Sequence, residues 1–185
     1  MDPIEILTNE HGLIRNYLDN LTKAVTKIEN GEKPPKEFFE RAVTFSREFA
    51  DKFHHFKEEQ LMFVRLAAKM RGAADAQIDA LRYQHERGRQ LVSQVEESLD
   101  GYEKGDSYKT SVLVESVAAY ASLLRQHIHT EDHIFYPMVR KELSDQEFDA
   151  LLVEFNKEKW EWGGDTFERH HKLVVEMSSI LSHMK

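Results

Sequence analysis

The stretch His54-His55-Phe56-Lys57-Glu58-Glu59 places two imidazoles and two neighbouring carboxylates in the middle of a segment that otherwise has the pattern of a buried helix. Apolar residues flank it on both sides, within residues 49–53 and again within residues 61–64. Ionisable side chains are costly to bury in a protein core unless a partner compensates their charge. Apolar packing alone therefore does not explain why these side chains lie here.

The composition of the chain narrows the possible explanations. Its 185 residues suffice for one domain with a full hydrophobic core. The 25 Lys and Arg against 33 Asp and Glu give a net charge of −8, which argues against nucleic acid or an anionic membrane as a partner. The chain has no cysteine, so a bound metal must be held by nitrogen and oxygen atoms. It has no long apolar run and no signal peptide, and we expect a cytoplasmic protein.

Apolar residues recur every three to four positions along the chain, which is the periodicity of amphipathic helices. Glycine and proline divide the chain into expected helices at residues 2–30, 36–70, 75–102 and 108–141, and into a fifth that starts at Ser144 and is broken at Gly163-Gly164. Short connections between long helices imply antiparallel neighbours. The predicted fold is all-α: an antiparallel up-and-down four-helix bundle over residues 1–142, with a C-terminal helical extension over residues 143–185 packed on it within a single domain.

Six ionisable side chains share the inward, apolar faces of the predicted bundle helices. They are His11, His54, Glu58, His85, His127 and Glu131. His11 precedes His54 by 43 positions and His85 precedes His127 by 42, so each predicted hairpin brings its two histidines to nearly one height. Each glutamate follows a histidine by four positions, which is about one helical turn.

This set has the chemistry of a binuclear metal site. Two metal ions a few ångströms apart repel strongly in a core of low dielectric constant, so carboxylates such as Glu58 and Glu131 are needed to bridge them. Four imidazoles and two carboxylates favour iron, manganese or zinc over copper(I), and iron is our first choice. Burial of all six groups without a cation would be strongly unfavourable, which favours metal binding over simple core packing.

Four further histidines and one further glutamate are interpreted as side chains without a role in metal binding. In an α-helix, adjacent side chains point about 100° apart, which moves a neighbour of an inward residue to the flank of the inward face. We assign His55, Glu59, His129 and His133 to this flank. His183 is expected to be terminal and solvated.

The motifs around the six residues resemble those of the hemerythrin-like, or HHE cation-binding, domain family. The resemblance covers roughly residues 5–142 and lies in residues 10–15, 54–63, 84–89 and 127–138, where two His-x-x-x-Glu motifs occur. It implies a non-haem di-iron centre with an oxo or hydroxo bridge, two bridging glutamates, and the ligands His11, His54, Glu58, His85, His127 and Glu131. It also implies reversible O2 binding, sensing of O2 or NO, or iron handling. Whether the protein is an enzyme stays open: we expect a metal- and O2-binding protein rather than an enzyme, with a peroxidase or NO-reducing side activity as an alternative.

One departure from the family concerns a fifth histidine. The oxygen carriers of the family take it from a His-x-x-x-His pair on the third helix, whereas the positions four residues from His85 are Leu81 and Arg89. His170 or His171 of the fifth helix could supply this imidazole. Our preferred interpretation is that His170 is a packed core residue and His171 a surface residue.

Other classes of protein stay open. Within the family, a di-iron oxidase or peroxidase, NO reduction and iron handling are alternatives to O2 binding. A ferritin-like oxidase needs two Glu-x-x-His motifs, and this chain has one, at Glu168 and His171. A helical interaction module with a structural cation would show no change of its absorption spectrum with redox state. The sequence leaves the oligomeric state and the native metal open.

Overall fold

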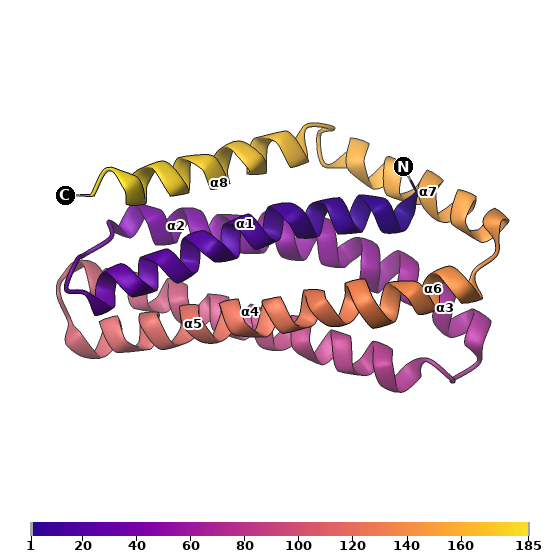
Figure 1. The fold of residues 1–185 in the computed structure, drawn as a ribbon, viewed down its shortest axis with the longest axis horizontal. Helices are drawn as coiled ribbons and strands as arrows, with labels where there is room; N and C mark the ends of the chain where they lie inside the picture. Colours follow the sequence, from indigo (N-terminus) through magenta and orange to yellow (C-terminus); the bar gives the residue numbers. More distant parts are fainter. Residues whose placement is uncertain (1, 185) are drawn as a thin grey trace.

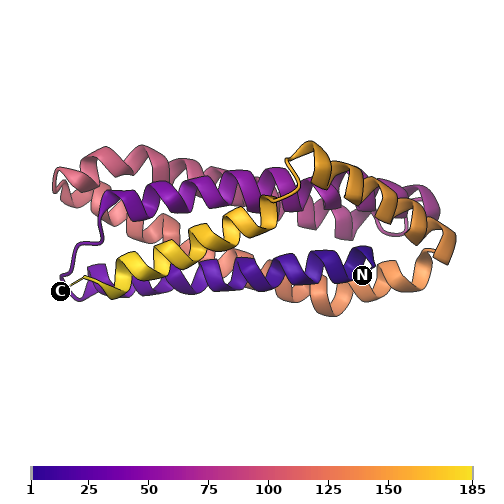
Figure 2. The ribbon, with the colours of Figure 1, turned by 90° about the horizontal axis from the view of Figure 1, so that it is seen from above.

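The computed structural model describes residues 2–184, and every regular element in this range is helical. The elements are α1 (Pro3–Glu29), α2 (Lys36–Phe45), η1 (Ser46–His55), η2 (Lys57–Met62), α3 (Phe63–Met70), α4 (Asp75–Glu103), α5 (Ser107–Thr130), η3 (Glu131–Phe135), α6 (Tyr136–Glu142), α7 (Asp145–Glu161) and α8 (Thr166–Ser182). Figures 1 and 2 show long helical segments lying side by side: the chain reverses direction after α1, α3, α4 and α6 and continues in the same direction from α7 into α8. No strand occurs within residues 2–184, which confirms the all-α prediction.

Local sequence signals start and stop these helices. The side chain of Asp2 accepts a hydrogen bond from the Glu5 amide, and the Glu5 carboxylate accepts one from the Asp2 amide, which forms a capping box at the start of α1. Ser144 and Glu147 form the same motif before α7, as the sequence predicts. Gly105 follows α4 with a φ of 81°, a left-handed conformation that favours glycine.

Residues 36–70 form one continuous helical segment whose middle is π-helical. In η1 and η2 the backbone hydrogen bonds span five residues instead of four, so the turns are wider than in an α-helix. The same hydrogen bonding recurs in η3, between α5 and α6. These segments overlap the two His-x-x-x-Glu motifs, at residues 54–58 and at Glu131, and short π-helical segments are frequently found at functional sites. The sequence periodicity does not predict them.

The bundle has two apolar clusters with a polar layer between them. Along α1, Leu7 belongs to one cluster and Leu13 to the other, with buried His11 between them. Along α4, Leu81 and Leu91 flank buried His85 in the same way. Apolar packing on both sides keeps water from the polar layer and strengthens electrostatic interactions inside it.

The C-terminal helices cover one side of the bundle. Figures 1 and 2 show α8 running alongside α1 and α2. The Asn20 side chain on α1 donates a 2.9 Å hydrogen bond to the Val174 carbonyl, and Arg41 on α2 pairs with Glu176. The division of the chain at residue 142 stays a prediction, although α6 ends at Glu142 and α7 begins at Asp145.

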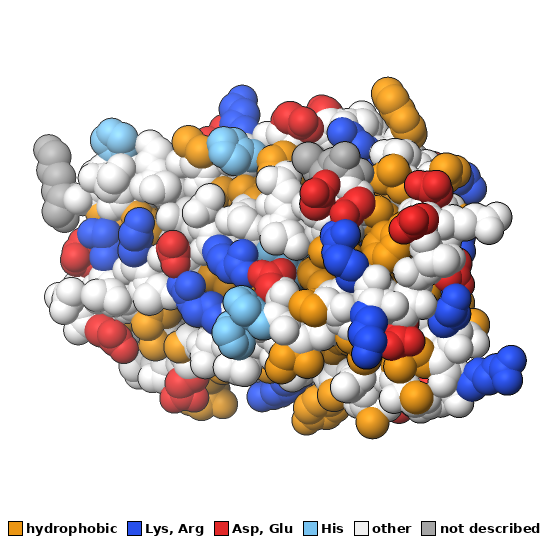
Figure 3. All heavy atoms as spheres, turned by 45° about the vertical axis from the view of Figure 1, so that its right-hand side comes forward, with side chains coloured by type: hydrophobic (Ala, Val, Ile, Leu, Met, Phe, Trp, Pro, Cys, Tyr) orange, Lys and Arg blue, Asp and Glu red, His pale blue; other side chains and the backbone are white. Residues whose placement is uncertain are grey.

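The surface is highly charged but shows no dominant sign on the face drawn in Figure 3, where acidic and basic side chains are interspersed. Among residues 2–184, none of the helices has both the length and the apolar character needed to span a membrane.

Candidate metal centre

Two groups of four buried side chains bring possible ligand atoms within 4.8 Å of one another. The first donor group consists of His11, His54, Glu58 and Glu131, and the second donor group of His55, Glu58, His85 and His127. The structure thus brings together all six residues that the sequence analysis singled out. Glu58 belongs to both groups, and His55 is an addition that the sequence analysis did not expect.

Each carboxylate lies between a histidine of one group and a histidine of the other. Glu131 Oε2 is 3.3 Å from His11 Nε2 and 3.1 Å from His127 Nε2. Glu58 Oε2 is 3.7 Å from His54 Nε2 and 3.5 Å from His85 Nε2. This arrangement is the one required of carboxylates that bridge two ions.

Several atoms of this cluster lack a hydrogen-bond partner although they are buried. They are His54 Nε2, His55 Nδ1, Glu58 Oε2, Glu131 Oε1 and Glu131 Oε2. Buried polar atoms in native proteins are almost always hydrogen-bonded, and burying them unpaired costs several kcal/mol each in an apolar medium. All five are imidazole nitrogens or carboxylate oxygens of residues in the two donor groups, so cations held by nitrogen and oxygen fit this site.

Hydrogen bonds at the outer nitrogens orient four of the five imidazoles. The Nδ1 atom of each contacts an oxygen: His11 with Asp132 at 2.8 Å, His54 with Glu10 at 2.8 Å, His85 with Glu59 at 2.6 Å and His127 with Gln84 at 2.8 Å. An acceptor at Nδ1 keeps the ring proton there and leaves the lone pair of Nε2 free to bind a metal.

Two of these acceptors have a sequence signal that could have revealed them. Glu59 directly follows Glu58, and Asp132 directly follows Glu131. Each therefore turns away from its own inward neighbour and contacts a histidine on an adjacent helix. Glu59 on η2 contacts His85 on α4, and Asp132 on η3 contacts His11 on α1. Glu10 and Gln84 carry no such signal, because only the packing of the helices brings them to His54 and His127.

The assignment of His55 to the flank of the inward face is wrong. His55 is buried, and its ring stacks on that of His85 with 3.7 Å between the centroids and 13° between the planes. The expected 100° offset holds for an α-helix, whereas the wider turns of η1 let His54 and His55 both face the interior. By contrast, His129 and His133 are exposed, as predicted.

The fifth helix does not supply an imidazole to either donor group. His170 is buried on α8, where its Nδ1 donates a 2.8 Å hydrogen bond to the Thr166 carbonyl and its Nε2 lies 3.4 Å from Glu48. Its ring contacts that of Phe49. His171 is exposed. His55 provides the fifth imidazole of the cluster instead.

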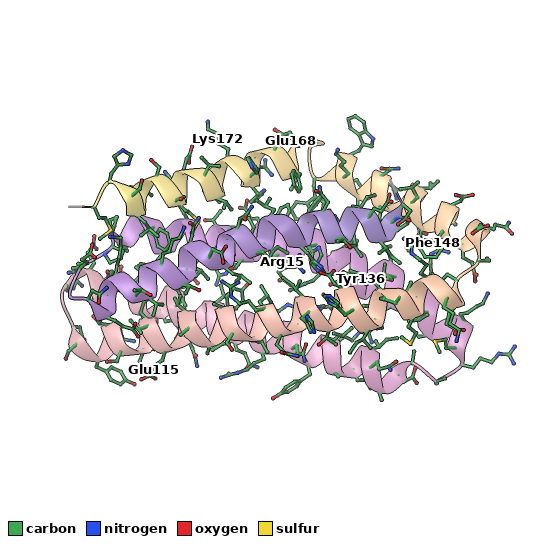
Figure 4. All side chains as sticks on the ribbon, viewed as in Figure 1. Arg15, Glu115, Tyr136, Phe148, Glu168 and Lys172 are labelled. Atoms are coloured by element: carbon green, nitrogen blue, oxygen red, sulfur yellow. The ribbon has the colours of Figure 1, made fainter. Side chains whose placement is uncertain are left out.

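Tyr136 is a further residue of the site that the sequence analysis missed. Figure 4 shows it on α6, in the interior of the bundle. Its hydroxyl donates a 2.5 Å hydrogen bond to Glu58 Oε1 and lies 3.4 Å from His11 Nε2. Its ring stacks on that of His11. A buried tyrosine needs a partner for its hydroxyl, and here the partners are residues of the first donor group.

Burial shifts the pKa values of several groups of the site. Burial, together with the negative charge of Glu131, raises the pKa of Glu58 well above its ordinary value. Burial lowers the pKa of His54 and of His55, and lowers that of His85 to about 3. These three imidazoles are therefore neutral at pH 7, which is the form that binds metal.

Arg89 connects the outer partners of two imidazoles. It bonds Asp51, which lies 3.6 Å from His55 Nδ1, and also Glu59, the partner of His85. Burial by itself raises the pKa of Asp51, but the nearby His55 ring and the hydrogen bond from Arg89 outweigh it and lower the pKa to about 2. The pKa of Glu59 is lowered to about 2 through His85 and Arg89 in the same way.

Arg89→Met is expected to make the protein more sensitive to acid. Carboxylates with a lowered pKa stabilise the fold fully above their unfolded-state values near 4, and this stabilisation is lost as the pH falls toward 2. Without Arg89 the two pKa values rise, so the midpoint of acid unfolding should shift upward by about half a pH unit or more. Circular dichroism between pH 2 and 6 measures this midpoint. Arg87→Met, which removes an exposed arginine of the same helix, is the control, and equal midpoints for the two variants would contradict the assigned role.

The helical bundle and its two donor groups define a metal-binding protein that uses histidine and glutamate. The chain belongs to the hemerythrin family: the model of the hemerythrin HHE cation binding domain matches residues 2–139. The two donor groups lie entirely within this range.

The curated relatives include the uncharacterized protein Rv1995 of Mycobacterium tuberculosis (strain H37Rv) and the uncharacterized protein Mb2018 of Mycobacterium bovis. Each is 26% identical to this chain over 155 residues, which is 84% of the chain and 60% of the relative. The chain thus spans about 60% of the length of these relatives. No solved structure matches it.

Proposed function

We propose that the two donor groups hold a pair of iron ions in an antiparallel up-and-down four-helix bundle, and that this pair binds O2 or another small diatomic molecule. The single observation that carries the proposal is that Glu58 belongs to both groups, while Glu131 also lies between a histidine of each. Nitrogen and oxygen donors without thiolate suit iron. Membership of a cation-binding family supports metal binding at this site.

The two donor groups would offer unequal ligation to a pair of ions. The first donor group supplies two imidazoles and the second supplies three, with the carboxylates of Glu58 and Glu131 between them. The position beside His11 and His54 would therefore be the more open of the two. A bound iron pair supplies reversible electron transfer to a diatomic ligand.

The chain itself would control this ligand through three features. The hydroxyl of Tyr136, which donates its proton to Glu58 Oε1 and lies 3.4 Å from His11 Nε2, would line the side of His11 and hold Glu58 in place. Asp132 and Glu10 hold the protons of His11 and His54 on Nδ1. The apolar clusters on both sides would limit the access of water along the bundle axis.

Metal analysis combined with absorption spectroscopy tests the proposal. We expect about two iron ions per chain, and an absorption spectrum that changes when the reduced protein is exposed to O2. A diatomic-binding protein should recover its reduced spectrum when O2 is removed. Redox-invariant absorption, or one ion per chain at full saturation, would contradict the proposal.

His55→Ala is expected to lower the iron content to about half or less, because it removes one of three imidazoles from the second donor group. His129→Ala is the matched control, since His129 is an exposed histidine of the other His-x-x-x-Glu motif, and it should retain native iron. His170→Ala should also retain it, because His170 lies outside both groups. Native iron content and spectrum in His55→Ala would exclude His55 as a ligand.

A further inference from the structure

A cavity of about 380 Å³ lies between η1 and α4 and reaches two histidines of the second donor group. His55 and His85 form its buried inner end, whereas Lys52 is exposed. Pockets for small organic molecules have volumes of about 300–1,000 Å³, while a single water occupies about 30 Å³ in the liquid. The cavity is therefore about ten times larger than a diatomic ligand requires.

One part of the cavity wall is apolar. Val92 and the buried side chain of Tyr120 line it. Gly88 leaves the space beside the Tyr120 ring open. A Cβ atom at position 88 would lie 3.4 Å from this ring and would occupy part of the cavity. A flat, apolar group matches this part of the wall, since aromatic faces pack well on such surfaces.

The basic side chains that line the cavity differ in whether they already form ion pairs with carboxylates of the chain. Arg47 forms an ion pair with Glu96, and Arg89 is held by Asp51 and Glu59. Lys52 has no ion-pair or hydrogen-bond partner among residues 2–184. One free ammonium group matches a ligand with a single negative charge better than one with two.

The acids around the inner end determine which way such a ligand would face. Asp51 lines the cavity beside His55, and Glu59 lies behind His85. The two carboxylates share a single cationic partner, Arg89, which leaves this end of the cavity with a surplus of negative charge. They repel an anionic group at the inner end, which leaves the mouth at Lys52 as the favourable place for it.

We propose that this cavity binds a small organic monocarboxylate, with its carboxylate at Lys52 and its apolar body between Val92 and Tyr120, next to His55 and His85. The role of this ligand at the metal pair rests on the proposed function, because it would bind beside the same two ions. Binding to the cavity itself needs only the chain.

Benzoate is a suitable probe because it combines one carboxylate with a flat apolar ring. Benzamide has nearly the same shape without the charge, and phenyl phosphate carries more negative charge. Titration calorimetry and ligand-observed NMR with the purified protein should show benzoate binding at least about fivefold tighter than benzamide. Equal affinities for benzoate and benzamide would overturn the proposal, and tighter binding of phenyl phosphate would overturn the monocarboxylate assignment.

Variants locate the binding site. Lys52→Met should weaken benzoate binding about fivefold to tenfold and leave benzamide unaffected. Lys141→Met, which removes an exposed lysine that does not line the cavity, should leave both affinities unchanged.

Ser93→Leu places a larger side chain on the cavity wall and should weaken the binding of both benzoate and benzamide. It avoids the backbone change that replacement of Gly88 entails, and native circular dichroism verifies its fold. Unchanged benzoate affinity in both Lys52→Met and Ser93→Leu would refute the location.

Iron analysis of the same samples separates the two proposals. A protein that holds two irons per chain and does not bind benzoate refutes the cavity assignment alone. A protein that binds benzoate in a Lys52-dependent manner without holding iron at saturation refutes the metal proposal and leaves the cavity assignment intact.

Discussion

Glu58→Gln is expected to lower the iron content to about a tenth of the native value or less, because Glu58 is the residue that both donor groups share. An amide keeps the shape of the side chain but lacks the charge that offsets two cations. Measurement of iron per chain after reconstitution checks this result. Glu115→Gln, which changes an exposed glutamate on α5 (Figure 4), is the control and should retain native iron.

The same substitution should affect stability in opposite directions with and without metal. Burial and the charge of Glu131 raise the pKa of Glu58, so ionisation of Glu58 destabilises the metal-free fold as the pH rises through this pKa. Glutamine removes this cost, and metal-free Glu58→Gln should be about 1–2 kcal/mol more stable than the metal-free parent at pH 8. In the presence of iron the parent should be the more stable protein. A variant that keeps full iron, or that is less stable in both states, would contradict the shared-ligand assignment.

Lys57→Met is expected to destabilise the protein by about 3–5 kcal/mol, because it leaves Glu10 buried without its cation. Lys57 is only 2% exposed, its ammonium group pairs with Glu10, and it lies 3.5 Å from the centre of the Phe53 ring. Glu10 in turn accepts the Nδ1 hydrogen bond of His54. Chemical denaturation of the metal-free protein measures the loss.

The pH dependence and a double variant test this explanation. Burial raises the pKa of Glu10, and removal of Lys57 raises it further, so Lys57→Met should lose more stability at pH 8 than at pH 5. Glu10→Gln combined with Lys57→Met should recover much of the loss. Lys69→Met breaks an exposed pair with Glu147 and should have a far smaller effect. A loss equal to that of Lys69→Met would show that the buried pair contributes little.

The sequence by itself determined the helices and six residues of the site. The periodicity of apolar residues and the capping residues Asp2 and Ser144 are local signals, so they predict where helices run and begin. The spacing of His11 from His54 and of His85 from His127 predicts that they meet, because helix rise and loop position fix their heights. All four lie in the two donor groups.

Only the tertiary structure decided which other residues complete the site. His55 faces inward because η1 is π-helical, and the wider turn arises from hydrogen bonding that the spacing of apolar residues does not reveal. Glu10, Gln84 and Tyr136 reach the cluster from neighbouring helices, across contacts that depend on how the helices pack. A local pattern specifies the face on which a side chain lies, whereas its partner on another helix is fixed by packing of the whole bundle.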